Sequence, residues 1–173
     1  MDHSGAKLDD VKQAFASMTF TAGLKESKKL EYRGYIGQLE EKALKAKAAL
    51  IKVNPSFDAI PLDAFLNVCL DESVVSRTEF SVSCASNKAL AYVGDSYLQL
   101  YISHSCFKKA YSPKKFQELC NVTVNSGNLA THYDALFEQD VVFQWTGNGT
   151  ATASSRQKSE LVVSTYLFNG DFG

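Results

Sequence analysis

The sequence predicts an all-α fold. Over most of its 173 residues, apolar side chains recur every three or four positions, which is the spacing of a helix that buries one face. Polar breaks that contain Gly, Pro, Asn or Ser separate these stretches and mark where helices end. Alternation of apolar and polar residues over 79–84 predicts one short strand. The chain is therefore expected to be almost entirely helical.

Two helices are predicted before residue 60. A short helical pattern covers 8–18, and a longer one rich in Lys, Glu, Ala and Leu covers 26–53. Asn54-Pro55 ends the longer helix, because proline lacks the N–H that continues helical hydrogen bonding. Its lysines stand beside glutamates, which favours a solvated face over one that binds RNA. These lysines are Lys42, Lys45, Lys47 and Lys52.

The second half predicts five further helices and one loop. The helices cover 62–70, 88–110, 113–121, 126–137 and 156–168. Pro113 follows Ser112 at the first position of its helix, where the missing N–H is harmless. The segment 144–155 is rich in Gly, Thr, Ser and Ala and predicts a loop. We divide the chain into an N-terminal helical extension, 1–60, and one domain, 61–173.

The composition is that of a globular protein. The chain is long enough for one domain with its own core, and it is 45% apolar and 21% charged. No apolar run reaches the roughly 18 residues that a membrane span needs. Residues 1–5 do not resemble the start of a secretion signal. We therefore expect an intracellular protein with no membrane partner.

Charge and cysteine usage narrow the function classes further. The net charge of −1 gives no general attraction to nucleic acid, so RNA binding has to come from local patches. The cysteines include no C-x-x-C pair, which argues against a zinc site and predicts reduced, mostly buried thiols. These cysteines are Cys69, Cys84, Cys106 and Cys120.

Two apolar helical segments each carry one carboxylate. Asp95 lies within 90–98, and Glu160 begins the segment 160–167. Mg²⁺ is a hard cation that proteins usually hold through one or two carboxylates, with water and substrate phosphate completing its shell. Two facing helices can present such carboxylates to one metal site.

Three segments resemble the ribonuclease III family and occur in the family's order. Residues 86–96, Ser-Asn-Lys-Ala-Leu-Ala-Tyr-Val-Gly-Asp-Ser, resemble its signature N-E-R-L-E-F-L-G-D-A. Residues 123–130 resemble L-V-S-N-E-T-L-A, and 160–172 resemble E-A-L-I-G-A-L-Y-L-D-G-G-F. The chain is most similar to the Mini-III branch, whose single-domain members lack a separate domain for binding double-stranded RNA.

The resemblance implies an all-α ribonuclease III-like endonuclease domain that cuts RNA with Mg²⁺ or Mn²⁺. The family's four ligand positions correspond to Ala91, Asp95, Gln157 and Glu160. Asp95 and Glu160 are then the catalytic residues and metal ligands, and Gln157 offers a neutral carbonyl ligand. Ala91 has no ligand atom, and Lys88 stands where the signature has an acid, so the carboxylate set is reduced.

The resemblance also implies partners. Members of the family dimerise and bind duplex RNA through its backbone and 2′-hydroxyl groups. We therefore expect double-stranded or structured RNA, and a homodimer or a heterodimer with a related domain. The expected RNA contacts are Lys108, Lys109, Lys114, Lys115, Arg156 and Lys158. The reduced carboxylate set leaves a second hypothesis open: a catalytically degenerate subunit that dimerises and scaffolds a ribonucleoprotein or RNA-processing complex.

Overall fold

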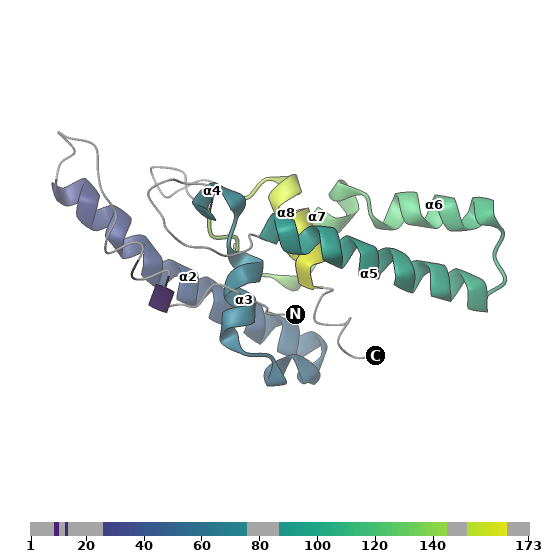
Figure 1. Ribbon diagram of the computed structural model, residues 1–173, viewed down its shortest axis with the longest axis horizontal. Coiled ribbons are helices and arrows are strands. Elements are labelled where there is room, and N and C mark those ends of the chain that lie inside the picture. The colour runs from purple at the N-terminus through teal and green to yellow at the C-terminus, as the bar shows by residue number, and fades with distance from the viewer. Residues whose placement is uncertain (1–8, 11–12, 14–25, 76–86, 145–151, 166–173) are drawn as a thin grey trace.

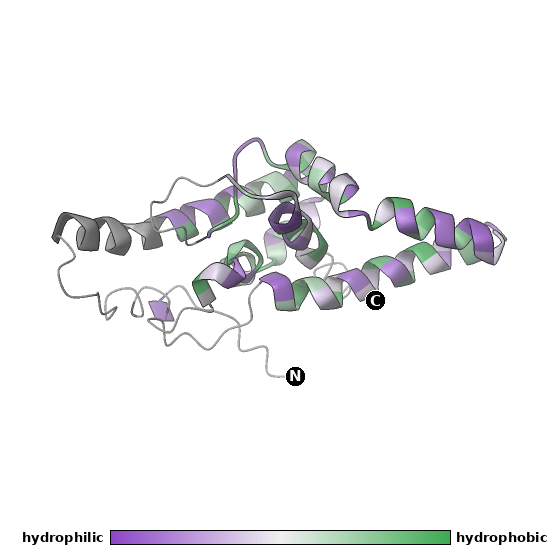
Figure 2. Ribbon diagram, turned by 90° about the horizontal axis from the view of Figure 1, so that it is seen from above, coloured by the Kyte–Doolittle hydropathy of each residue, from purple (hydrophilic) through white to green (hydrophobic). Residues whose placement is uncertain are grey.

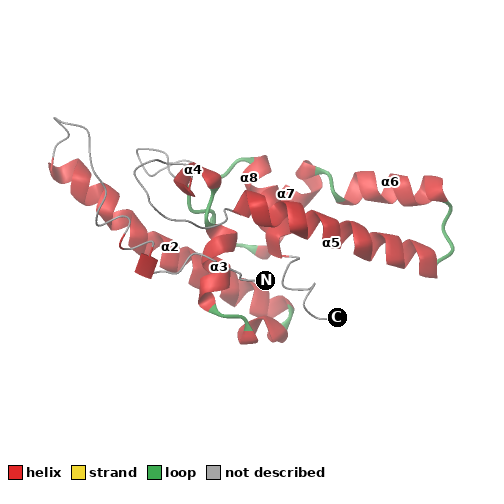
Figure 3. Cartoon of the chain, viewed as in Figure 1, coloured by secondary structure: helices red, strands yellow, loops and turns green. Residues whose placement is uncertain are grey.

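The all-α prediction is confirmed. The computed structural model describes residues 9–10, 13, 26–75, 87–144 and 152–165. In these ranges the regular elements are helices, and the only β pairing is an isolated parallel bridge between Leu70 and Phe143 (Figure 3). The strand predicted at 79–84 lies outside the described residues. No helix in the described ranges combines the length and the apolarity that crossing a membrane requires.

The helix boundaries agree with the sequence pattern to within a few residues. The elements are α2 (Glu26–Val53), the 3₁₀ helix η1 (Pro55–Ala59), α3 (Leu62–Cys69), α4 (Glu72–Val75), α5 (Asn87–Lys108), α6 (Pro113–Thr123), α7 (Ser126–Leu136) and α8 (Ser155–Thr165). The 3₁₀ helix η1 and the single-turn helix α4 are the described elements that the pattern misses. Of the helix predicted at 8–18, only residues 9, 10 and 13 are described, and all three are helical.

Side-chain caps fix where several helices begin. Asn54 follows α2 and caps η1 by accepting a hydrogen bond from the Ser56 N–H. Ser112 caps α6 in the same way, with its Oγ 3.2 Å from the Lys115 nitrogen. Asn125 caps α7 and accepts from the Gly127 N–H at 2.8 Å. Each cap satisfies an N–H group that has no partner inside its helix, which is why these breaks recur between the helices.

One hydrophobic core joins the helices. In the arrangement of Figure 1, α5 and α7 both pack against α8, and α2 packs against α3. Leu39 of α2, Phe65 of α3 and Leu161 of α8 are fully buried in the same cluster. The helix α2 therefore contributes to the same core as the helices that follow residue 60.

A polar network fastens α2 to the segment after α7. Lys42 Nζ donates to the Val142 carbonyl at 2.7 Å. Tyr133 Oη donates to Asp140 at 2.6 Å and accepts from the Val141 N–H at 2.8 Å. Because each buried polar group has a partner, this network stabilises the junction rather than weakening the core.

The prediction of a solvated lysine face on α2 is wrong for two of its members. Lys42 and Lys47 are half-buried, and their ammonium groups donate to backbone carbonyls, that of Ile60 in the case of Lys47. Lys45 and Lys52 are exposed, and Lys45 pairs with Glu41 one turn away. The inward pair therefore acts in packing, because long lysine stems can cover apolar surface while the head group finds an oxygen.

The cysteine prediction is confirmed for the three cysteines that the structure describes. Cys69, Cys106 and Cys120 are free and buried, whereas Cys84 lies outside the described residues. Burial raises the pKa of the Cys69 thiol to about 12. The thiolate is the reactive form, so Cys69 is an inert core residue.

The end of α5 carries a strained residue that a glycine would relieve. Ala110 has φ 54°, its N–H donates to the Phe107 carbonyl, and the Tyr111 N–H donates to the Cys106 carbonyl. This left-handed helix end normally uses glycine, because a Cβ costs roughly 1 kcal/mol there. Ala110→Gly should therefore raise the free energy of unfolding by about 0.5–1 kcal/mol in a denaturant titration. Ala48→Gly, at an exposed interior position of α2, is the control and should lower it by about 1 kcal/mol. A loss of stability in Ala110→Gly would contradict this helix end.

Candidate metal and RNA site

The site begins with the close crossing of α5 and α8. A Cβ built on Gly94 would overlap the carbonyl oxygen of Val163 and lie 2.8 Å from its carbonyl carbon. Only glycine lets the two backbones approach so closely. Asp95 follows Gly94 in α5, and Glu160 lies one turn before Val163 in α8. The crossing therefore brings the two predicted ligands to one place.

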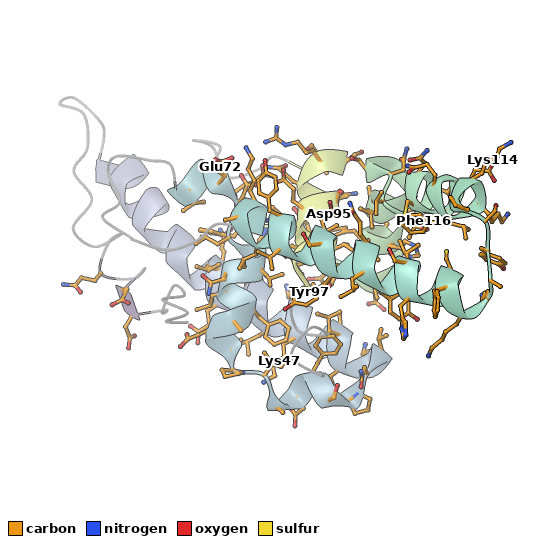
Figure 4. The ribbon with its side chains drawn as sticks, turned by 45° about the vertical axis from the view of Figure 1, so that its right-hand side comes forward. Lys47, Glu72, Asp95, Tyr97, Lys114 and Phe116 are labelled. Atoms are coloured by element: carbon orange, nitrogen blue, oxygen red, sulfur yellow. The ribbon has the colours of Figure 1, made fainter. Side chains whose placement is uncertain are left out.

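Asp95 and Glu160 line the same pocket. Its volume is about 360 Å³, and it lies between α5, α7 and α8. Ala91, one helical turn before Asp95, lines it as well. Two basic side chains, Lys88 and Arg156, complete its charged lining. Figure 4 shows Asp95 near the middle of the molecule, between the α2–α3 side and the projecting end of α5 and α6. Three of the four ligand positions implied by the resemblance thus share one pocket.

The Glu160 side chain is mostly buried. Its side chain is 17% exposed, and Arg156 Nε lies 3.3 Å from its Oε1. Burial raises the pKa of Glu160; Arg156 and Lys88 lower it, and Asp71 and Glu72 raise it. A carboxylate that has lost hydration and has acidic neighbours gains most from a nearby cation.

Asp95 is held more loosely. It is half-buried, and its Oδ2 accepts a hydrogen bond from Gln99 Nε2 at 3.3 Å, one turn further along α5. A bond of that length to a neutral amide is weak. Asp95 can therefore turn towards a cation at little cost.

Two acids that the sequence did not point out, Asp71 and Glu72, lie close enough to Glu160 to raise its pKa. Asp71 is buried, and its carboxylate accepts a hydrogen bond from the Ser73 N–H in the first turn of α4. Glu72 forms an ion pair with Lys88 at 3.1 Å, and this hydrogen bond raises the pKa of Lys88. Lys88 thus occupies the position of the signature acid and is itself balanced by an acid from α4. No periodic pattern signals a helix of one turn, so neither residue could be assigned from the sequence.

Gln157 does not line the pocket. Its Oε1 accepts from the Ser154 N–H at 2.9 Å, and its N–H donates to Ser154 Oγ at 3.2 Å. This reciprocal pair is a capping box at the start of α8. Its Nε2 also donates to Gln144 Oε1 at 2.9 Å. To act as the neutral metal ligand that the resemblance implies, Gln157 would have to give up these hydrogen bonds.

The six basic residues expected to contact RNA fall into three groups. Arg156 lines the pocket beside Glu160. Lys158 forms an ion pair with Asp134, with 2.6 Å between Nζ and Oδ1, and its ammonium group lies over the Tyr133 ring. The remaining four, Lys108, Lys109, Lys114 and Lys115, are exposed at the far end of the α5–α6 hairpin, where Figure 4 labels Lys114.

The described residues offer few ligands for a metal ion. In the part of the chain that the structure describes, no three His, Cys, Asp or Glu side chains gather into a ligand group. The pocket offers the carboxylates of Asp95 and Glu160. Mg²⁺ commonly uses one or two protein carboxylates with water and phosphate oxygens, and Mn²⁺ accepts the same oxygen ligands. The residues present therefore fit Mg²⁺ or Mn²⁺ as a reduced site.

Comparisons with models of known families, with curated proteins and with solved structures found no match to this chain. The resemblance to ribonuclease III therefore rests on the three motifs and on the pocket that residues from all three of them line.

The raised pKa of Glu160 predicts a change in stability with pH. Its value exceeds the ordinary 4.5 in the folded protein, so stability falls as pH rises through the window between the two values. Glu160→Gln removes this loss, and the exposed Arg156 side chain contributes little to the pair. Without metal, the variant should melt higher than wild type at pH 7.5, and the difference should shrink towards pH 4. Thermal melts at both pH values test this. A constant difference would contradict the assignment.

Proposed function

We propose that this chain is a ribonuclease III-like endonuclease that cleaves double-stranded or structured RNA with Mg²⁺ or Mn²⁺. One observation carries the proposal: the close crossing at Gly94 places Asp95 and Glu160 in one pocket. The resemblance requires this meeting of two motifs that lie far apart in the sequence. Neither the periodicity of the helices nor the packing of the core requires carboxylates there.

The acidic residues of the pocket would bind the metal ion, and its basic residues would bind phosphate. Asp95 and Glu160 supply two oxygen ligands from two helices. When bound, the divalent ion supplies Lewis-acid charge next to the scissile phosphodiester. Arg156 is 70% exposed and pairs with Glu160, so its guanidinium can leave that carboxylate and bind two oxygens of a phosphate group through two N–H groups. Lys88, which lines the same pocket from α5, can add a second phosphate contact.

A cleavage assay on duplex RNA with Mg²⁺ tests the nuclease. Asp95→Asn and Glu160→Gln should each lose metal-dependent cleavage, because each removes an anionic ligand without changing size. Glu118→Gln is the matched control, since Glu118 is an exposed acid on α6 away from the pocket. If wild type cuts no faster than Asp95→Asn, the nuclease proposal is lost.

An apolar face on α5 supports the dimer. Tyr92, Val93 and Leu100 are 73%, 48% and 65% exposed, and Val93 and Leu100 lie seven residues apart on one side of the helix. A second copy packed on this face would bury these side chains. The resulting dimer would carry two pockets, both of which could contact one RNA duplex. Leu100→Lys should therefore shift the protein to a monomer in light scattering. Val122→Lys, at a comparably exposed apolar site on α6, should not. A wild-type monomer would exclude the homodimer.

The charge balance of the pocket favours a second candidate function. Arg156 already pairs with Glu160, Glu72 pairs with Lys88, and Ala91 supplies no ligand. Such a pocket can be stable without metal, as in a subunit that holds RNA or a partner without cutting. Millimolar Mn²⁺ or Mg²⁺ should raise the melting temperature of an enzyme through binding to the folded state. No shift in wild type would favour the scaffold.

A further inference from the structure

The α5–α6 hairpin ends in a strongly basic tip. In the views of Figures 1 and 2, α5 and α6 run side by side away from the other helices. We define the hairpin tip as residues 107–115. It contains Lys108, Lys109, Lys114 and Lys115, all exposed and none in an ion pair with another described residue. No acidic residue occurs between Asp95 and Glu118. The hairpin tip is thus a local cluster of positive charge in a chain of net charge −1.

Two aromatic rings are exposed among these lysines. Phe107 is 84% exposed, more than any other large apolar side chain that the structure describes, and Tyr111 is 42% exposed. Lys109 Nζ lies 5.8 Å from the centre of the Tyr111 ring. Exposed aromatic rings next to cations are what single-stranded nucleic acid binds, because bases stack on the rings while lysines neutralise the phosphates.

The backbone holds the tip in one shape. At the left-handed Ala110, α5 ends in two hydrogen bonds: the Ala110 N–H donates to the Phe107 carbonyl, and the Tyr111 N–H donates to the Cys106 carbonyl. Ser112 caps α6. The rings and lysines therefore stand on helix ends of fixed geometry. A preformed platform loses less entropy on binding than a flexible loop does.

We propose that the hairpin tip binds unpaired nucleotides of RNA, with bases stacked on Phe107 and Tyr111 and with the four lysines on the phosphates. The proposal rests on the RNA-binding part of the proposed function and names its substrate class: a duplex with a single-stranded flank. Phe107 is twelve residues beyond Asp95 in α5, about 18 Å at 1.5 Å per residue. One RNA can therefore reach both the pocket and the tip. Bases inside a duplex are already stacked, so the rings select unpaired ones.

A membrane surface fits the tip less well. Membrane-bound amphipathic helices present a continuous apolar face of many side chains. The tip exposes one phenyl ring and one half-exposed tyrosine between four lysines. The tip therefore presents more charged than apolar side chains. This favours a polyanion that also offers flat bases.

Fluorescence anisotropy with labelled RNA in EDTA tests the tip without requiring cleavage. The probes are a single-stranded RNA, a blunt duplex, and that duplex with a single-stranded overhang. Phe107→Ala should weaken binding of the single strand and the overhang about tenfold, within the range for one stacked base. It should change blunt-duplex binding less than twofold, and Phe107→Trp should retain wild-type affinity. Val122→Ala, an exposed apolar site on α6, is the control and should change nothing.

The outcomes separate this proposal from the nuclease. Loss of single-strand affinity in Phe107→Ala supports the tip even if wild type cuts no RNA. Cleavage by wild type together with unchanged affinity in Phe107→Ala overturns the tip alone. Equal loss for single strand and blunt duplex overturns the preference for unpaired bases. Phe107-dependent binding to vesicles that contain phosphatidylserine, without RNA binding, overturns the ligand class. Conversion of a dimer to a monomer by Phe107→Ala assigns the ring to a protein interface and also overturns the proposal.

Discussion

Gly94→Ala is expected to lower the free energy of unfolding by about 3 kcal/mol or more, the upper range for overpacking a core. The added Cβ would overlap the Val163 carbonyl oxygen, which belongs to the backbone of another helix and cannot rotate away. The crossing of α5 and α8 has to open, and core contacts of Leu98 and Leu161 on these helices weaken with it. The same movement separates Asp95 from Glu160.

The same chain offers matched controls for this variant. A Cβ on Gly34 or Gly37, both within α2, meets nothing within 4 Å. Gly34→Ala and Gly37→Ala should therefore raise stability by about 0.5–1 kcal/mol, because alanine is the better helix former. Denaturant titrations of the three variants measure the contrast. If Gly94→Ala costs less than about 1 kcal/mol, the two helices do not cross at this point and the pocket as described does not exist.

The helices were predictable because local signals end them. Asn54-Pro55 stops α2 at Val53, as the sequence predicts, and Ser112-Pro113 starts α6. The inward lysines were not predictable, because Lys42 and Lys47 bond to backbone carbonyls. Every residue type carries such a carbonyl, so only tertiary packing decides which of them a lysine reaches. Charge spacing along α2 carries no information about it.

Part of the candidate site was also predictable from the sequence, and part was not. The motifs pointed to Asp95 and Glu160, and the pocket contains both. Asp71 and Glu72, at the start of α4, are missing from that prediction because a single turn has no periodicity. Gln157 was assigned as a metal ligand for a different reason. Its residue type suits a weak ligand as well as a cap, yet Ser-x-x-Gln before an apolar run at 154–157 is itself the sequence pattern of the capping box that the structure shows.

Ala91→Glu is expected to turn the reduced site into a stronger one. Ala91 lines the pocket one helical turn before Asp95, so a carboxylate there can join Asp95 and Glu160 around one ion. Without metal, three clustered acids repel one another, and the variant should melt below wild type. With metal, the added anionic ligand should tighten Mn²⁺ binding about tenfold or more, which corresponds to about 1.4 kcal/mol.

Calorimetric titration with Mn²⁺ measures the effect, and Ala91→Gln is the matched control because it adds the same bulk without charge. Ala91→Gln should bind Mn²⁺ like wild type. Gln157→Asp should not tighten binding, because the shorter side chain loses the bond to Gln144 and weakens the cap of α8. This asymmetry between the two positions follows from the pocket, since the family resemblance alone treats both as missing acids. Equal or weaker Mn²⁺ affinity in Ala91→Glu would mean that position 91 does not face the ion, and the metal site would have to be sought elsewhere on α5.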